Sequence, residues 1–168
     1  MHAILGCDTT SQLYGRGKKV ALKLICTNSV FQAQAGVFGD FNSTKEQVTA
    51  AGERAIVTVY GGKGDDNLDF LRLQQFHQKV GSGTSSVKPE VLPPTSAAAK
   101  YHSMRVFLQV QQWIGNGEHF KPEEWGWLIH NGMYIPVLTD MEAAPVCISC
   151  SNYDIIHVMN NAAEVIYD

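Results

Sequence analysis

The part of this sequence that could do chemistry is a carboxylate followed by a glycine-rich turn and a basic segment. Asp8 stands seven residues before the first glycine of the turn, and the positive charges follow the turn directly. Glycines let backbone N–H groups approach a ligand closely, and a helix N-terminus attracts anions. This combination favours a phosphate ligand, for which a nucleic-acid backbone is one obvious source. The residues expected to contact such a backbone are Gly15, Arg16, Gly17, Lys18, Lys19 and Lys23.

The same residues also have a purely structural interpretation. Gly15 and Gly17 could form a tight turn, and Asp8 could cap a helix. Short G-x-G patterns often occur without binding anything, so the pattern alone leaves both interpretations open.

Helical patterns should position these residues. Apolar side chains at helical spacing predict a helix over residues 19–26, with the lysines around its entry and on its opposite face. Thr44 predicts the start of a second helix over residues 45–60, because Gln47 at its third position completes a capping box. The expected buried stripe of that helix is Val48, Ala51, Ala55, Ile56 and Val59.

Two further helices are expected. Asp65 or Asp66 could cap the first of them, whose expected inward face is Phe70, Leu73, Phe76, His77 and Val80. Thr95 should cap the longest helix, over residues 96–115. Its broad apolar surface implies burial on more than one side, or a partner surface.

The pattern changes to β near the end of the chain. Asn131-Gly132 separates two β-prone runs, which is a strong signal for a hairpin because both turn residues need positive φ. Pro136 predicts an edge strand, since proline cannot donate a ladder hydrogen bond. Trp125 and Trp127 flank Gly126 and are expected on one side of a strand, where a hydrophobic plug is a better explanation than base stacking.

Composition limits the class of protein. The 168 residues are 45% hydrophobic with a net charge of −3, so no global basic field marks a nucleic-acid binder and any binding must come from a local patch. No apolar run approaches the length of a membrane helix, so no membrane partner is expected. An intracellular, reducing setting follows, with the nucleus as one location. The oligomeric state cannot be deduced.

The cysteines are too few and too irregular for a disulfide scaffold. Cys147 and Cys150 form a C-x-x-C pair that could supply half of a tetrahedral Zn²⁺ site. No second pair follows, so two ordinary reduced cysteines are the favoured interpretation.

The segment from Gly6 to Ile25 resembles the flap-endonuclease branch of the PIN-like nucleases. In that branch G-x-D is followed at this spacing by two glycines around a hydrophobic residue, a basic residue and Ala-x-x-Leu-Ile. The residues in register are Gly6, Asp8, Gly15, Gly17, Lys19, Ala21, Leu24 and Ile25. Most of the chain also resembles a set of uncharacterised animal proteins, some of them derived from mobile elements. The matching pieces are residues 2–19, Leu92-Pro93-Pro94-Thr95 and Glu124-Trp125-Gly126-Trp127.

The nuclease resemblance implies metal-dependent phosphodiester hydrolysis. Asp8 would be one of several carboxylates that hold Mg²⁺ or Mn²⁺. The sequence departs from the family pattern in two places: Arg16 replaces an aliphatic residue, and Thr9 replaces an aromatic one. The other carboxylates would precede His2, so this chain is expected to be a C-terminal fragment that is not catalytic alone. Residues 1–30 should then be loosely held, because Ile4, Leu5, Leu24 and Ile25 would have little to bury against.

The expected fold is mainly α with one late β-hairpin, as the C-terminal part of an α/β PIN-like nuclease fold plus a helical extension. The expected regions are a PIN-like remnant (1–30), a helical region (31–80), a linker (81–94), a long helix with the hairpin (95–150) and a tail (151–168). The expected function is binding of a nucleic-acid backbone. The alternative is a non-catalytic scaffold or protein-interaction module of a domesticated mobile-element protein.

Overall fold

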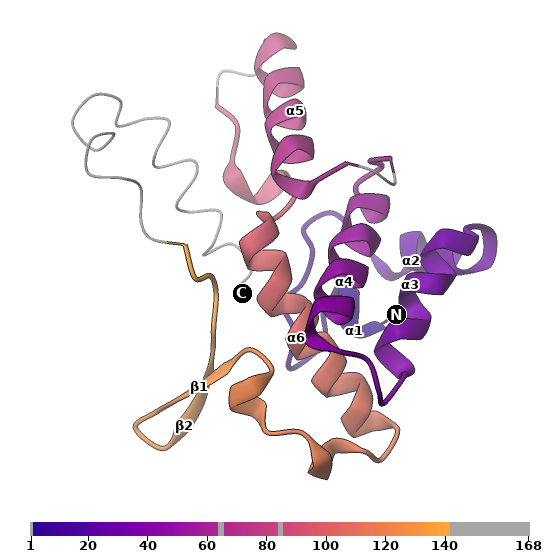
Figure 1. Ribbon diagram of the computed structural model, residues 1–168. Coiled ribbons are helices and arrows are strands. Elements are labelled where there is room, and N and C mark those ends of the chain that lie inside the picture. Colours follow the sequence, from indigo (N-terminus) through magenta and orange to yellow (C-terminus); the bar gives the residue numbers. More distant parts are fainter. Residues whose placement is uncertain (1, 64–65, 84–85, 142–168) are drawn as a thin grey trace.

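A long helix at the centre of the fold organises the computed structural model, which describes residues 2–63, 66–83 and 86–141. Figure 1 shows this helix, α6 (Ser96–Trp113), beside α4 (Lys45–Val59), with the N-terminal helices α2 (Lys18–Thr27) and α3 (Ser29–Gly39) on one side and the hairpin on the other. The remaining helices are α1 (His2–Leu5) and α5 (Leu68–Gly81). Three single-turn 3₁₀ helices are η1 (Pro89–Val91), η2 (Gly117–His119) and η3 (Pro122–Glu124). The expectation of a mainly helical chain with a late hairpin is confirmed.

The core forms around α6. This helix packs against α4, α3 and α1, and every residue from 102 to 109 is buried. The predicted burial on more than one side is therefore confirmed. Thr95 caps the helix as expected, since its side chain accepts a hydrogen bond from the Ala98 N–H.

The capping box predicted for α4 is present. The Thr44 side chain accepts from the Gln47 N–H, and the Gln47 side chain accepts from the Thr44 N–H at 2.8 Å. All five residues of the predicted stripe are buried: Val48, Ala51, Ala55, Ile56 and Val59. Gly52 lets α6 come close, because a Cβ there would lie 1.8 Å from the Ser103 Oγ.

Two predictions about α5 are wrong. Asn67 caps this helix, with its side chain accepting from the Phe70 N–H, whereas the Asp66 carboxylate accepts from the Lys63 N–H; Asp65 lies outside the described residues. The buried residues of α5 are Leu68, Leu71 and Arg72. Four residues of the face predicted to point inward are exposed, namely Phe70, Leu73, His77 and Val80, and Phe76 is half-buried.

The expectation that residues 1–30 have little to bury against is also wrong for α1. Ile4 and Leu5 are 1% and 4% exposed, because α1 packs on α6 and α2. Leu24 and Ile25 of α2 are half-buried against the same core. The N-terminal segment therefore belongs to the core of this chain.

The hairpin forms at the predicted turn. Strands β1 (Trp127–His130) and β2 (Met133–Pro136) pair antiparallel, and Asn131 and Gly132 have φ of 50° and 77°. Only the second tryptophan of the pair lies in a strand. Gly126 has a φ of 87°, which turns the chain, so Trp125 is buried against Phe107 instead of sharing a strand face with Trp127. The expected hydrophobic plug is present, but the expected strand geometry is wrong.

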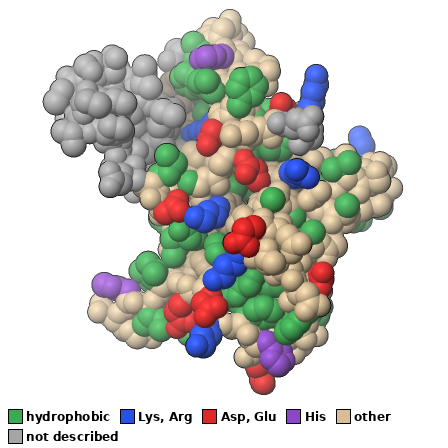
Figure 2. Space-filling view, in the orientation of Figure 1, with side chains coloured by type: hydrophobic (Ala, Val, Ile, Leu, Met, Phe, Trp, Pro, Cys, Tyr) green, Lys and Arg blue, Asp and Glu red, His purple; other side chains and the backbone are tan. Residues whose placement is uncertain are grey.

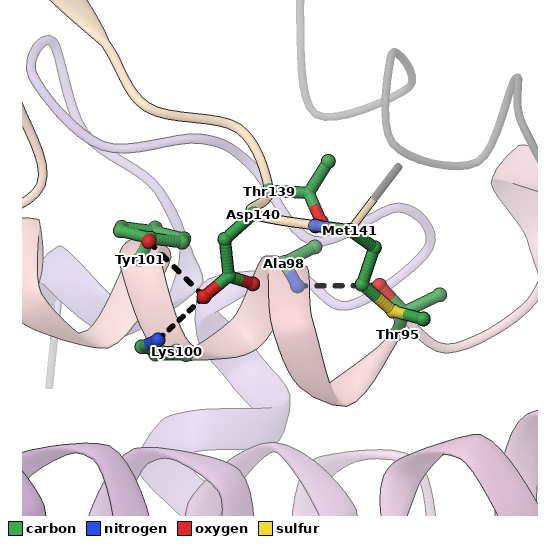
Figure 3. Close-up of polar contacts among 7 residues, drawn as sticks. All are labelled: Thr95, Ala98, Lys100, Tyr101, Thr139, Asp140 and Met141. Atoms are coloured by element: carbon green, nitrogen blue, oxygen red, sulfur yellow. Dashed lines mark hydrogen bonds and ion pairs between the residues drawn. The ribbon is translucent and has the colours of Figure 1, made fainter. Parts of the chain in front are cut away.

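After the hairpin the chain returns to the start of α6. Figure 3 shows Asp140 between Lys100 and Tyr101, with the Lys100 ammonium donating to its carboxylate at 2.7 Å. The Tyr101 hydroxyl donates to the same carboxylate oxygen at 3.2 Å. Across the described residues, no helix has the length and apolarity to cross a membrane.

Candidate functional site

The turn that carries Asp8 is closed by backbone hydrogen bonds. Cys7 and Thr10 exchange two N–H···O bonds of 3.0 and 3.1 Å, which leaves Asp8 and Thr9 exposed at the tip. Gly6 enters this turn with a φ of 112°, and a Cβ at that position would lie 2.5 Å from the Gln12 Cα. A side chain at position 6 is therefore excluded on two grounds, since the conformation is left-handed and the space is filled.

Two hydroxyls tie the turn to the core. The Thr10 hydroxyl donates to the Ala3 carbonyl of α1 at 2.6 Å, and the Thr9 hydroxyl donates to the Gln109 side chain of α6. These two hydrogen bonds hold the turn to α1 and to α6, and the turn presents the Asp8 carboxylate to solvent. Asp8 does not cap α2, because that helix begins ten residues later with Gly17 at its N-cap.

The N-terminus of α2 has no side-chain cap. Gly17 occupies the N-cap in an extended conformation, and Gly15 before it has a φ of 67°, so both glycines form the turn that the sequence predicts. The Val20 N–H donates to the Gly17 carbonyl at 3.0 Å in the first turn. Lys18, Lys19 and Lys23 are exposed, whereas Ala21 is buried.

Arg16 points to a different neighbour. Its guanidinium lies 4.7 Å from the centroid of the Tyr60 ring at the end of α4. Burial raises the pKa of Tyr60 to about 12, and the nearby Arg16 charge acts in the opposite direction. The phenol therefore stays neutral at ordinary pH, and the cation packs on a neutral ring. Arg16 helps to dock the G-x-G turn on α4.

An open cleft of about 670 Å³ brings the carboxylate and the basic helix entry together. The turn from Gly6 to Gln12 forms one wall, Lys18 forms part of another, and His2, Arg105, Trp127 and Pro136 complete the lining. A neighbouring groove of about 430 Å³ shares His2 and Lys18 with the cleft and continues along α2 past Lys19 and Leu22. Asp8 and Lys18 line the cleft, and Lys18 and Lys19 line the neighbouring groove, whereas Gly15, Arg16, Gly17 and Lys23 are not among the described residues that line either hollow.

The sequence did not indicate that Arg105 would line this cleft. Arg105 on α6 donates from Nη1 to the Val137 carbonyl at 2.6 Å and to the Gly126 carbonyl at 3.3 Å. Its guanidinium also lies 6.0 Å from the centroid of the Trp127 ring. Arg105 therefore fixes the base of the hairpin against α6. No local pattern could indicate this, because the two partners lie 21 and 32 residues away.

The donor atoms of the cleft do not fit a divalent metal site. Asp8 is the one carboxylate among the described residues that line it, and two of the others, Lys18 and Arg105, are cations. Within the described residues, no three His, Cys, Asp or Glu side chains come together in a group that could hold a metal ion. Cys147 and Cys150, the residues of the zinc prediction, lie outside the described residues. Cys7 and Cys26 are free thiols.

Charge is distributed unevenly along the chain. Residues 1–39 contain four basic side chains (Arg16, Lys18, Lys19 and Lys23) and one carboxylate (Asp8), a local balance of +3 in a chain whose net charge is −3. The four cations of the expected local patch all lie in this segment, and three of them, Lys18, Lys19 and Lys23, are exposed.

No protein-family model matches this sequence, and comparison with curated proteins and with solved structures returned no match. The functional interpretation therefore depends on the residues and on their arrangement.

Proposed function

We propose that this chain binds the phosphodiester backbone of a nucleic acid along the α2 surface. The observation that supports the proposal is that Lys18 and Lys19 line two neighbouring hollows at the N-terminus of a ten-residue helix that has no side-chain cap. N–H groups and the helix dipole favour a phosphate at that end, and the lysines add mobile positive charge.

The Asp8 carboxylate limits where a phosphate can lie. The Asp8 carboxylate and a phosphate are both negative and repel each other. The nucleic-acid backbone would therefore lie near the lysines and away from the Asp8 turn. Hydrolysis, which the family resemblance implies, requires several carboxylates around a metal ion, and the described residues offer one in this cleft. The proposal is therefore confined to binding.

The test is salt-dependent binding of the purified chain to labelled single-stranded, duplex and flap DNA, followed by fluorescence anisotropy. The triple variant Lys18→Ala, Lys19→Ala, Lys23→Ala should lose about tenfold or more in affinity at low salt, because each lost phosphate contact removes counterion release. Its logarithmic salt slope on duplex DNA should fall by up to about 3. Asp8→Asn should act in the opposite direction and raise affinity roughly two- to fivefold, since it removes a repulsive charge.

A matched control removes the same charge elsewhere. Lys63, Lys88 and Lys121 are exposed lysines on other segments, so their triple alanine variant has the same net charge as the α2 variant. It should keep most of the affinity and of the salt slope. Equal losses in the two triple variants would show a non-specific charge effect, and no binding by the parent chain at low salt would refute the proposal.

A further inference from the structure

The start of the hairpin separates two tryptophans that lie two residues apart in the sequence. Trp125 is 5% exposed and packs on Phe107. Trp127 is half-buried and lines both the cleft beside Asp8 and a smaller hollow of about 250 Å³, the hairpin groove. Figure 1 shows the hairpin projecting from the helical body, and Figure 2 shows hydrophobic side chains on its surface. Trp125 therefore fills the core, whereas the indole of Trp127 contacts two open hollows.

A second aromatic side chain lines the hairpin groove. Trp127 of β1 lies opposite Pro136 of β2, and Tyr134 stands two residues before Pro136. Side chains two residues apart share one face of a strand, so Trp127 and Tyr134 are diagonal neighbours on one face of the hairpin. Tyr134 is 53% exposed, and its hydroxyl donates to the Glu123 carboxylate at 3.4 Å. The hairpin groove thus has two aromatic rings in its walls.

The other walls of the hairpin groove suit the flat ring of a nucleobase. Leu108 and Pro122 add apolar surface. The side chains of Thr9, Gln109 and Gln112 carry donors and acceptors, which match the groups along the edge of a base. Its volume of about 250 Å³ is below the range of about 300–1,000 Å³ for pockets that enclose a drug-sized ligand. The groove therefore fits a single ring system better than a larger molecule.

Charge assigns the phosphate and the base of a nucleotide to different parts of this surface. Lys18 and Trp127 line the same cleft, so a phosphate held at Lys18 has an aromatic ring in the wall of the same hollow. Glu123, bonded to Tyr134, places a negative charge beside the hairpin groove. That charge disfavours a phosphate there and leaves the uncharged base as the part of the nucleotide that fits.

We propose that Trp127 and Tyr134 form a stacking site for an unpaired base of a nucleic acid whose phosphates bind at Lys18 and Lys19. The inference rests on the proposed function and adds the class of ligand, which is a single strand. Aromatic side chains stack on any base that has a free face. In a duplex each base is covered by its neighbours in the stack, so an unpaired base is the one that offers a face to the hairpin groove.

The test compares single-stranded and duplex oligonucleotides of equal length by fluorescence anisotropy. Tyr134→Ala should lose about fivefold or more in affinity for the single strand, because stacking of one base on an aromatic side chain contributes about that factor or more. It should lose less than about twofold on the duplex, and its logarithmic salt slope should match that of the parent, since no charge is removed. Single strands of DNA and of RNA both carry the base, so both are measured, and the tighter one identifies the strand.

Further variants separate stacking from the structure of the hairpin. Tyr134→Phe keeps the ring and should retain the affinity of the parent for the single strand, whereas Tyr134→Leu should lose as much as Tyr134→Ala. Leu128→Ala is the matched control, because Leu128 is 52% exposed on the opposite face of the same hairpin. It should bind like the parent. Circular dichroism should show that these variants are folded, since the changed side chains are exposed.

Tryptophan fluorescence reports on Trp127 directly. A base stacked on an indole quenches its emission, so the single strand should quench the parent and should quench Trp127→Phe much less. Trp113→Phe should be quenched like the parent. Trp113 is 53% exposed on α6 and is not among the described residues that line the cleft or the hairpin groove.

The outcomes separate this inference from the proposed function. Binding that depends on Lys18 and Lys19 but is unaffected by Tyr134→Ala would overturn the stacking site and leave phosphate binding in place. Equal losses on the single strand and on the duplex would also overturn the stacking site, because a duplex has no free base face to lose. No binding of any oligonucleotide by the parent at low salt would overturn both.

Discussion

His102 shows how a single buried residue makes the stability of this fold depend on pH. The side chain is 1% exposed, and its Nε2 lies 2.9 Å from the Ile4 carbonyl, so the neutral tautomer carries its proton on Nε2. Its Nδ1 is buried without a hydrogen-bond partner. Burial lowers the pKa of His102 to about 4 and the Arg105 charge lowers it further, against the opposing hydrogen bond to Ile4. Protonation would put a charge on a nitrogen that nothing solvates.

The sign of the pH effect follows from these values. The unfolded chain takes up the proton near pH 6.5 and the folded chain only near pH 4, so the stabilisation is complete above pH 6.5 and is lost as the pH falls toward 4. Between about pH 7.5 and pH 5 the free energy of unfolding should fall by about 2 kcal/mol from this group alone. Urea unfolding at the two pH values measures this difference.

The variant His102→Gln should reduce that difference. A glutamine amide can donate to the Ile4 carbonyl as Nε2 does, but it does not titrate in this range. His130→Gln on the hairpin is the control, because His130 is exposed and should leave the difference unchanged. If His102→Gln retained the full pH dependence, another buried group would have to cause it.

The helices of this chain differ in how far their formation depends on neighbouring residues in the sequence. α4 and α6 start where Thr44 and Thr95 cap them, and these caps can be identified from a few neighbouring residues. α1 is different, because four residues cannot hold a helix by themselves. Its stability comes from Ala3, Ile4 and Leu5 packing on α6, and from the hydrogen bonds that Thr10 and His102 make to its carbonyls.

A substitution in α1 should therefore destabilise the whole fold. Ile4→Ala removes a side chain that is 1% exposed and should lower the free energy of unfolding by about 2–5 kcal/mol. Leu22→Ala on α2 removes an exposed side chain of similar size, 64% exposed, and should change it by less than about 0.5 kcal/mol. Urea unfolding followed by circular dichroism compares the two.

Hydrogen exchange gives the complementary measurement for α1 and α2. Amides of Leu13 and Val20 are hydrogen-bonded within the N-terminal region, so they should be protected if that region belongs to the core. Exchange at the rate of an unfolded peptide over residues 2–27 would show that the N-terminal helices are not held as described.

At the scale of the whole molecule, the surface proposed for phosphate binding and the exposed apolar face of α5 lie on different elements. The first follows α2, and no described residue that lines its two hollows belongs to α5. A substitution on the exposed face of α5 should therefore leave DNA binding unchanged.

The variant Leu73→Glu tests that separation, because Leu73 is 50% exposed on α5. It should bind DNA with the same affinity and salt slope as the parent in fluorescence anisotropy, and circular dichroism should show that it is folded. A loss of DNA binding in folded Leu73→Glu would instead show that the binding surface includes α5.

Local sequence determined those features that depend on near neighbours. The capping box of Thr44 and Gln47, the Asn131-Gly132 turn and the glycine turn before α2 each involve residues within a few positions of one another, and all three are present. Periodicity also found the apolar stripe of α5. It could not show that this stripe faces solvent, because a second stripe through Leu68 and Leu71 packs on the fold and the pattern does not rank the two.

Tertiary structure alone decided which distant residues meet. Asp8 and Lys18 line a cleft with Trp127, more than a hundred residues away, because α6 holds both the Asp8 turn, through Gln109, and the hairpin, through Arg105. The burial of Ile4 has the same origin, since its packing partners come from the middle of the chain. Side-chain types and spacings record local backbone preferences, whereas contacts between distant segments depend on how complete elements pack, and that packing is a property of the whole chain.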